Sequence, residues 1–189
     1  MKPRIDGQSE RRMKFFKPGL YLRYNSSDNA VADRADRQWE HAIRAYREHL
    51  ESFANTMNDR VKELAESLCL HDAELLSIQV DSSPGRAKRP PFLPGVATVS
   101  VKSAGTIVNL FYPLWEEVGE STTPKDWPFS GLRTHWLYDE IDLAESGRSP
   151  RYWHRIFFSD GRVISIPFAD VIIHTFSEEN PQPAIVSRR

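Results

Sequence analysis

The segment from Tyr152 to Phe168 constrains the fold more than any other part of this sequence. It reads YWHRIFFSDGRVISIPF, so two runs of aromatic and β-branched residues flank the polar residues 159–161. Runs of this kind on either side of a short glycine-containing segment predict a β-hairpin. We therefore begin with its register, because the register decides which side chains face the core.

Two registers are compatible with this turn. A two-residue loop at Asp160-Gly161 places Phe157 opposite Ile164, whereas a three-residue loop with Gly161 in the left-handed conformation places Ile156 opposite Ile164. A slip of one residue exchanges the two faces, so the register that segregates the residue types better is favoured. That is the three-residue loop, which gathers on one face Tyr152, His154, Ile156, Phe158, Ile164, Ile166 and Phe168. The other face carries Arg155, Ser165, Trp153, Phe157 and Val163.

The composition bounds the class of protein. The chain has 189 residues, of which 40% are hydrophobic and 27% are charged, as in ordinary globular proteins. Its net charge of -1 makes a general nucleic-acid binder an unfavoured interpretation. Cys69 is the only cysteine, so no intrachain disulfide forms and a reducing, cytoplasmic setting fits. No apolar run approaches the ~20 residues of a transmembrane helix, so we expect no membrane contact.

Residues 35–68 predict helices. Apolar side chains recur there every three or four positions from Trp39 to Leu68, and charged residues fill the opposite face. Helix propensity is weak at 55–59, so we expect a break, with Thr56 or Asn58 capping a second helix. The apolar stripe is wide and aromatic, which favours a helix pair covering one face of a sheet over a coiled-coil seam.

The second half of the chain predicts antiparallel strands. Besides the hairpin, strands are expected at 75–80, 96–101, 106–112 and 134–143, with a last strand or helix-like turn at 169–176. Helices followed by hairpin-connected strands predict an α+β fold, with N-terminal helices packed on an antiparallel sheet of about five to six strands. We expect one domain at 13–176, a flexible basic arm at 1–12 and a disordered tail at 177–189. Met13 is a plausible second start.

Short motifs carry a resemblance to a known family. They are 13–16 (MKFF), 70–73 (LHDA), 137–141 (LYDEI) and 154–161 (HRIFFSDG). Together they resemble an uncharacterised bacterial family known as a domain of unknown function, over most of 13–176. The resemblance implies a helical N-terminal half, a Leu-His-Asp-Ala junction and a C-terminal antiparallel sheet. It implies no activity, because the family has none assigned.

A candidate polar cluster consists of His71, Asp72, Asp139 and His154. The His71-Asp72 pair invites comparison with the metal dyad of phosphohydrolases, but no upstream helical histidine with matching spacing accompanies it. The favoured interpretation is therefore structural. Asp72 would accept backbone N–H groups at a turn, and His71 would pack on or bond to a neighbouring strand.

Asp139 is expected to share a strand face with Leu137, Ile141 and Leu143. A carboxylate on an apolar face is costly unless it is paired, so we expect a partner, either Arg155 or His154. If the His and Asp side chains converge, they could hold a metal ion or perform acid–base chemistry; a buried polar network is the favoured alternative. The metal is left open and no cofactor is predicted.

Cys69, beside Leu68 and Leu70 at a helix end, is expected to be a buried, inert thiol.

The irregular segment 113–136 offers candidate partner-binding residues. They are Trp115, Glu116, Glu117, Trp127 and Phe129. Aromatic residues dominate interface hot spots, and the acids favour a basic protein partner such as a toxin. The alternative, that these aromatic residues pack on the sheet and seal the core, has at least equal support.

Three functions therefore stay open. The leading hypothesis is a non-enzymatic protein-binding module of the immunity or accessory type. The second is a metal-dependent, hydrolase-like enzyme that uses the His/Asp cluster. The third is a nucleic-acid-associated factor, which would use the cations Arg11, Arg12, Arg86, Lys88 and Arg89.

Overall fold

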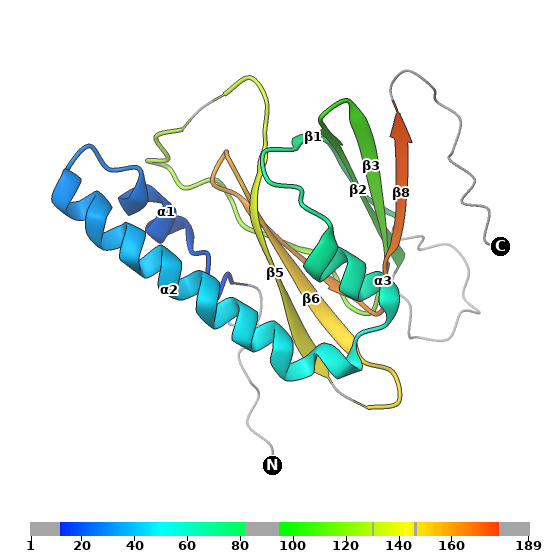
Figure 1. Ribbon diagram of the computed structural model, residues 1–189. Helices are drawn as coiled ribbons and strands as arrows, with labels where there is room; N and C mark the ends of the chain where they lie inside the picture. Colours follow the sequence, from blue (N-terminus) through cyan, green and yellow to red (C-terminus); the bar gives the residue numbers. More distant parts are fainter. Residues whose placement is uncertain (1–11, 82–94, 130, 146, 178–189) are drawn as a thin grey trace, which may run out of the picture.

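The computed structural model describes residues 12–81, 95–129, 131–145 and 147–177. Within these ranges the chain has an α+β fold, in which helices precede an antiparallel sheet (Figure 1). The helical elements are α1 (Pro18–Tyr24), α2 (Asn29–Phe53), the 3-10 turn η1 (Ala54–Thr56), α3 (Asp59–Lys62) and the π-helical turn η2 (Glu63–Ser67). Most of the predicted arm and tail, and the loop with Arg86, Lys88 and Arg89, lie outside the described residues.

The helix boundaries follow from capping side chains. The Asp28 carboxylate accepts the N–H groups of Ala30 and Val31 and so begins α2. After α2 ends, the side-chain oxygen of Asn58 accepts the N–H of Val61 and begins α3. The predicted break is therefore confirmed, and Asn58 is the capping residue.

The strands form one antiparallel sheet. They are β1 (Glu74–Asp81), β2 (Gly95–Ser103), β3 (Thr106–Leu114), β4 (Gly119–Glu120), β5 (Trp136–Glu145), β6 (Arg151–Phe158), β7 (Val163–Phe168) and β8 (Ile172–Ser177). Their order is β1-β2-β3-β7-β6-β5, with β4 added beside β7 and β8 beside β3. The described residues form eight strands, more than the predicted five to six, because the two-residue β4 lies in the expected irregular segment and 172–177 is a true strand.

The sheet curls until its two outer strands meet. An antiparallel bridge joins Glu74 at the start of β1 to His135, just before β5. The N–H of Leu75 donates to the Thr134 carbonyl at 2.8 Å, and the N–H of Trp136 donates to the Ala73 carbonyl at 2.9 Å. The concave inner face of the sheet is therefore closed on one side.

The hairpin register is the predicted one. Ile156 lies opposite Ile164, and the N–H of Phe158 donates to the Arg162 carbonyl at 2.9 Å. Gly161 adopts φ +86°, the left-handed conformation that the three-residue loop requires. The hairpin is also the centre of the molecule, because both of its faces are buried.

Two apolar clusters cover these two faces. The inner core lies on the concave face and includes Ile156, Phe158, Ile164, Ile166 and Phe168. The outer core lies on the convex face and comprises Met13, Phe16, Leu20, Ala35, Trp39, Ala42, Leu137, Phe157 and Val163.

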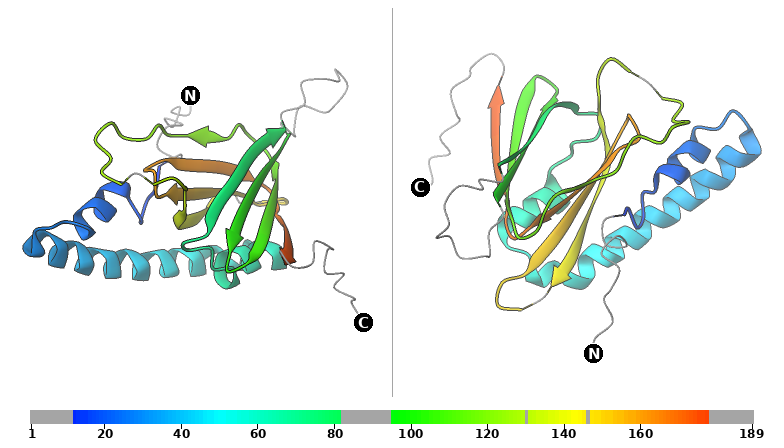
Figure 2. Two further views of the ribbon diagram at one scale, coloured as in Figure 1. Left: turned by 90° about the horizontal axis from the view of Figure 1, so that it is seen from above. Right: turned by 180° about the vertical axis from the view of Figure 1, so that it is seen from behind.

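The sequence predicts a helix pair on one face of the sheet, but the helices pack on both faces. α2 contributes Ala35, Trp39 and Ala42 to the outer core, whereas Val61 of α3 belongs to the inner core. Figures 1 and 2 show α2 along one side of β5 and β6, and α3 on the other side, between β6 and the β3–β8 pair. The last turn of α2 already reaches the inner core through Phe53, so the chain passes from the convex to the concave face at the end of α2, before the break at Asn58. No helix in the described part of the chain is long and apolar enough to span a membrane.

Candidate functional site

A hydrogen-bonded chain of three side chains crosses the inner core. The Tyr112 hydroxyl lies 2.9 Å from His154 Nδ1, and His154 Nε2 lies 3.1 Å from Asp139 Oδ2. The indole N–H of Trp136 donates to the other carboxylate oxygen of Asp139 at 2.9 Å. The His154 side chain is fully buried, and 31% of the Asp139 side chain is exposed. Asp139 is therefore the end of this inner chain that solvent reaches.

The proton positions in the inner chain follow from its two ends. Burial, and then the negative charge of Asp139, raise the pKa of Tyr112 well above its ordinary value, so the phenol keeps its proton. The Asp139 carboxylate can only accept a hydrogen bond, so the imidazole N–H that faces it is on Nε2 of His154. In the tautomer with its single proton on Nε2, Nδ1 is an acceptor, and the Tyr112 hydroxyl donates to it. The chain fixes one tautomer of the imidazole and orients the carboxylate.

The strand face of Asp139 differs in part from the prediction, because β5 contains a β-bulge. The pairing with β6 shifts between Trp136 and Tyr138, so Leu137 and Tyr138 both pack on the outer side. Asp139 consequently shares the inner face with Ile141 and Leu143, but not with Leu137. The expected partner for the carboxylate exists, and it is His154 rather than Arg155.

His71 and Asp72 lie at the junction between η2 and β1. His71 Nδ1 donates to the Leu137 carbonyl at 2.5 Å, and the imidazole packs on the Tyr138 ring. The predicted bond to a neighbouring strand is therefore present. Asp72 adopts φ +63°, and its exposed carboxylate lies 3.6 Å from His71 Nε2. Among the described contacts, this carboxylate accepts no backbone N–H, contrary to the expectation.

Only part of the candidate cluster shares one hollow. A depression of about 280 Å³ is lined by His71, Asp139, Cys69 and the η2 turn. His154 is paired to Asp139 beneath this depression, and Asp72 does not line it. Within the described residues, no three or more His, Cys, Asp or Glu side chains are placed to hold a metal ion.

Cys69 is exposed, so the prediction of a buried thiol is wrong. The chain leaves η2 in an extended conformation, with Leu68 at φ -88° and ψ 107°. Successive side chains alternate in extended backbone, so Leu68 and Leu70 pack inward while Cys69 points to solvent.

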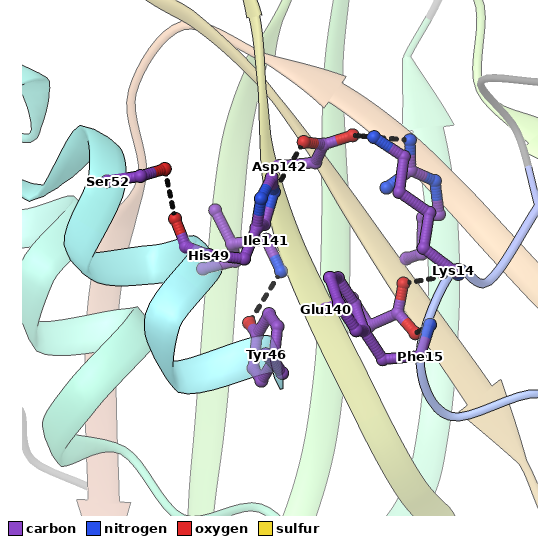
Figure 3. A network of polar contacts seen from close by, with 9 residues as sticks. Lys14, Phe15, Tyr46, His49, Ser52, Glu140, Ile141 and Asp142 are labelled. Carbon is purple, nitrogen blue, oxygen red and sulfur yellow. Dashed lines mark hydrogen bonds and ion pairs between the residues drawn. The ribbon is translucent and has the colours of Figure 1, made fainter. Parts of the chain in front are cut away.

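A second polar network lies on the convex face, beneath the segment that precedes α1 (Figure 3). The buried Glu140 carboxylate accepts the backbone N–H groups of Lys14, Phe15 and Phe16 at 2.7, 2.6 and 2.7 Å. Asp142 pairs with the Lys14 ammonium and lies 2.8 Å from His49 Nε2 on α2. We call these residues, with Arg155, the outer network.

The pKa values of the two acids in the outer network, Glu140 and Asp142, shift in opposite directions. Burial raises the pKa of Glu140, and the three backbone N–H groups and the Arg155 charge offset this only in part. Burial also raises the pKa of Asp142, but bonds from Lys14 and His49 and the charge of Arg155 outweigh it, so the net pKa is lowered. Arg155 Nη2 lies 3.1 Å from Asp142 and is the buried cation between the two acids.

The sequence places Glu140 and Asp142 close together on one strand but does not indicate their partners Lys14 and His49. Alternation along β5 places both acids on one face, which is the signal that a polar cluster exists there. Lys14 lies 128 positions from Asp142, and His49 lies 93 positions from it, so no local spacing connects them.

The aromatic residues of segment 113–136 pack on the domain. The Trp115 indole N–H donates to the Tyr152 carbonyl at 3.2 Å, and that of Trp127 donates to the Ser159 carbonyl at 2.8 Å. Phe129 contacts the rings of Trp127 and Tyr21. These three aromatic side chains are therefore partly buried against the domain, and part of each stays exposed.

The acids of the same segment border a groove. This acidic groove has a volume of about 560 Å³, and its apolar lining comes from β1, β3 and β7 and includes Ile78, Val80, Leu114 and Ile164. Glu116, Glu117, Glu120 and Arg162 are its charged residues. Arg162 is bound to Glu120 at 2.8 Å and to Asp160 at 2.7 Å, so the positive charge is already neutralised. The groove combines an apolar floor with a negative border.

No family model, curated protein or solved structure matches this chain. The resemblance to a family of unknown function accordingly stays a prediction.

Proposed function

We propose that this protein is a non-enzymatic binding module of the immunity or accessory type, which binds a basic segment of a partner protein in the acidic groove. The observation that carries the proposal is the pairing of an apolar floor with three carboxylates. Apolar anchors supply affinity and complementary charge selects the partner and speeds its approach. The single cysteine, Cys69, fits a cytoplasmic module.

The groove has the dimensions of a site for a few anchoring side chains. Its volume of about 560 Å³ falls within the ~300–1,000 Å³ range of ligand pockets. Val80 is 44% exposed at its border, so a bound apolar side chain would cover surface that now contacts water. Glu117 is exposed there and adds negative charge.

A random peptide library displayed on phage tests this proposal. Peptides that bind the full chain should combine basic residues with an apolar anchor. Val80→Ser should weaken the best peptide about tenfold, because it removes apolar contact area. Val96→Ser is the matched control, since Val96 is 40% exposed on the neighbouring strand but does not line the groove.

Charge gives a second comparison with the same peptide. Glu117→Lys should weaken binding roughly threefold to tenfold at low salt, whereas Glu48→Lys on the exposed face of α2 should not. Selected peptides without basic residues, or equal binding by the Val80 and Val96 variants, would rule the proposal out.

Acid–base catalysis at Asp139 is a second candidate function. Its support is the inner chain, in which a buried hydroxyl and imidazole orient a carboxylate that reaches the hollow beside His71. Hydrolysis of p-nitrophenyl acetate and p-nitrophenyl phosphate tests it. Activity should be lost in Asp139→Asn and kept in Asp72→Asn. Absence of turnover, or turnover that survives in the Asp139 variant, would eliminate this candidate.

A further inference from the structure

A second cleft, distinct from the acidic groove, lies between the segment before α1 and the segment after β4. Its volume is about 720 Å³, which is also within the ~300–1,000 Å³ range of small-molecule sites. Among the residues that the structure describes, the charged ones that line it are all cations: Arg12, Lys14 and Lys17. We call it the cationic cleft. Its charge contrasts with the net charge of -1 of the whole chain.

Two of the three cations are available to a ligand. Lys14 is paired with Asp142, whereas Arg12 and Lys17 are exposed and form no ion pair with any residue that the structure describes. A positive field from unpaired cations attracts anions and raises their local concentration.

The wall that carries these cations is held in place. Glu140 binds the consecutive N–H groups of residues 14–16, which follow Arg12 and precede Lys17. Met13 and Phe16 are buried in the outer core on either side of Lys14. Because the backbone between the two exposed cations is fixed, a ligand does not have to order it, and the entropic cost of binding is lower.

The opposite wall adds hydroxyl groups and apolar surface. The Ser121 hydroxyl accepts the N–H of Val163 at 2.8 Å, so its own proton remains to be donated. Thr122 is exposed beside it. Val163, Pro18 and Pro124 supply apolar lining.

We infer that the cationic cleft binds an organic phosphate monoester. Two cations and two hydroxyl donors match a dianion with three terminal oxygens better than they match a carboxylate, which has two. The apolar lining suits a ligand with an apolar body. This inference concerns a site separate from the acidic groove and does not depend on the proposed partner.

Isothermal titration of the full chain tests the inference. The probes are phenyl phosphate, benzoate and phenol, which share a ring and differ in the charged group. Phenyl phosphate should bind, and benzoate and phenol should bind at least about tenfold more weakly. Binding of benzoate as tight as that of phenyl phosphate, or no binding of phenyl phosphate at about 10 mM, would overturn the inference.

Variants locate the bound phosphate. Lys17→Gln and Arg12→Gln should each raise the Kd for phenyl phosphate about tenfold, because each removes a charge-assisted hydrogen bond. Arg44→Gln is the matched control, since Arg44 is an exposed cation on α2 outside the cleft. Equal effects of Arg44 and Lys17 substitution would show nonspecific attraction and contradict the site.

A nucleic-acid backbone is the other source of phosphate. A single-stranded oligothymidylate distinguishes it, because such binding falls steeply with salt as counterions are released. We expect the oligonucleotide to bind no more tightly than phenyl phosphate. Much tighter binding that is lost in Lys17→Gln would replace the small-molecule ligand with a nucleic acid.

Discussion

Arg155 Nη2 lies 3.1 Å from the Oδ2 atom of Asp142, with the arginine side chain fully buried and the aspartate side chain only 8% exposed. A buried cation is costly unless it is paired, so the acids on β5 and this cation on β6 depend on one another. The pair also fixes the N-terminal segment, because Asp142 in addition binds Lys14. Asp142 thus links β5 both to β6, through Arg155, and to the segment that precedes α1, through Lys14.

Acid should remove the contribution of Asp142 to stability. Its folded-state pKa is lowered, so its contribution is present above the unfolded pKa of ~3.9 and is lost as the pH falls through the folded value. The difference in free energy of unfolding between the wild type and Asp142→Asn should shrink as the pH falls below ~3.9. Urea denaturation at several pH values measures it. A difference that grows as the pH falls would have the wrong sign.

Tyr112→Phe should destabilise the protein by about 1–3 kcal/mol, because it leaves His154 Nδ1 buried without its donor. Chemical denaturation measures this loss, and Tyr24→Phe is the exposed control. Nitrogen NMR shifts of His154 in the wild type should show the Nε2–H tautomer. The Nδ1–H tautomer would contradict the assigned direction of the inner chain.

Gly161→Ala should be far more damaging than Gly105→Ala. Both glycines have positive φ, +86° and +78°, so each substitution carries a strain of about 1–2 kcal/mol. A Cβ at Gly161 would also lie 2.6 Å from Trp127 Cδ2 and 2.9 Å from Pro124 Cδ, whereas one at Gly105 meets nothing within 4 Å. Thermal unfolding of both variants measures the two effects: Gly105→Ala reports the backbone strain alone, and the additional loss in Gly161→Ala reports the steric clash with Trp127 and Pro124. Equal losses would mean that the turn moves freely away from Trp127.

The inner face of the hairpin should respond differently from its tip. Ile156→Asp or Ile164→Asp should unfold the protein, because each places an unpaired carboxylate in the inner core at a cost of several kcal/mol. Arg162→Ala should change stability by about 1 kcal/mol or less, since its partly exposed ion pairs contribute little. Circular dichroism and urea denaturation measure both. Tolerance of aspartate at position 156 would contradict the observed register.

Local patterns predicted the features that depend on neighbouring residues. Alternation and Gly161 determined the hairpin register, and the weak helix propensity at 55–59 located the break that Asn58 caps. The fold class followed from the order of these elements. The packing of α2 and α3 on opposite faces of the sheet could not be predicted in this way. An apolar stripe shows that a helix is buried, but it does not show which face of the sheet the helix covers.

The candidate site was predictable only in part. The need of Asp139 for a partner followed from its place among apolar residues, and His154 provides it. The bulge at 137–138 was not visible, since one extra residue leaves the composition of a strand unchanged. The exposure of Cys69 was also not predictable, because it depends on the exact residue at which η2 ends and the chain becomes extended.

The hydrogen bonds between the Glu140 carboxylate and the N–H groups of residues 14–16 also set an order of events during synthesis. Residues 14–16 leave the ribosome long before β5, so their N–H groups have no carboxylate to bind until most of the chain has been translated. The earliest described segment is therefore among the last to be immobilised. The contacts of Phe15 and Phe16 with Tyr46 on α2 involve no residue of β5, so they do not depend on this carboxylate.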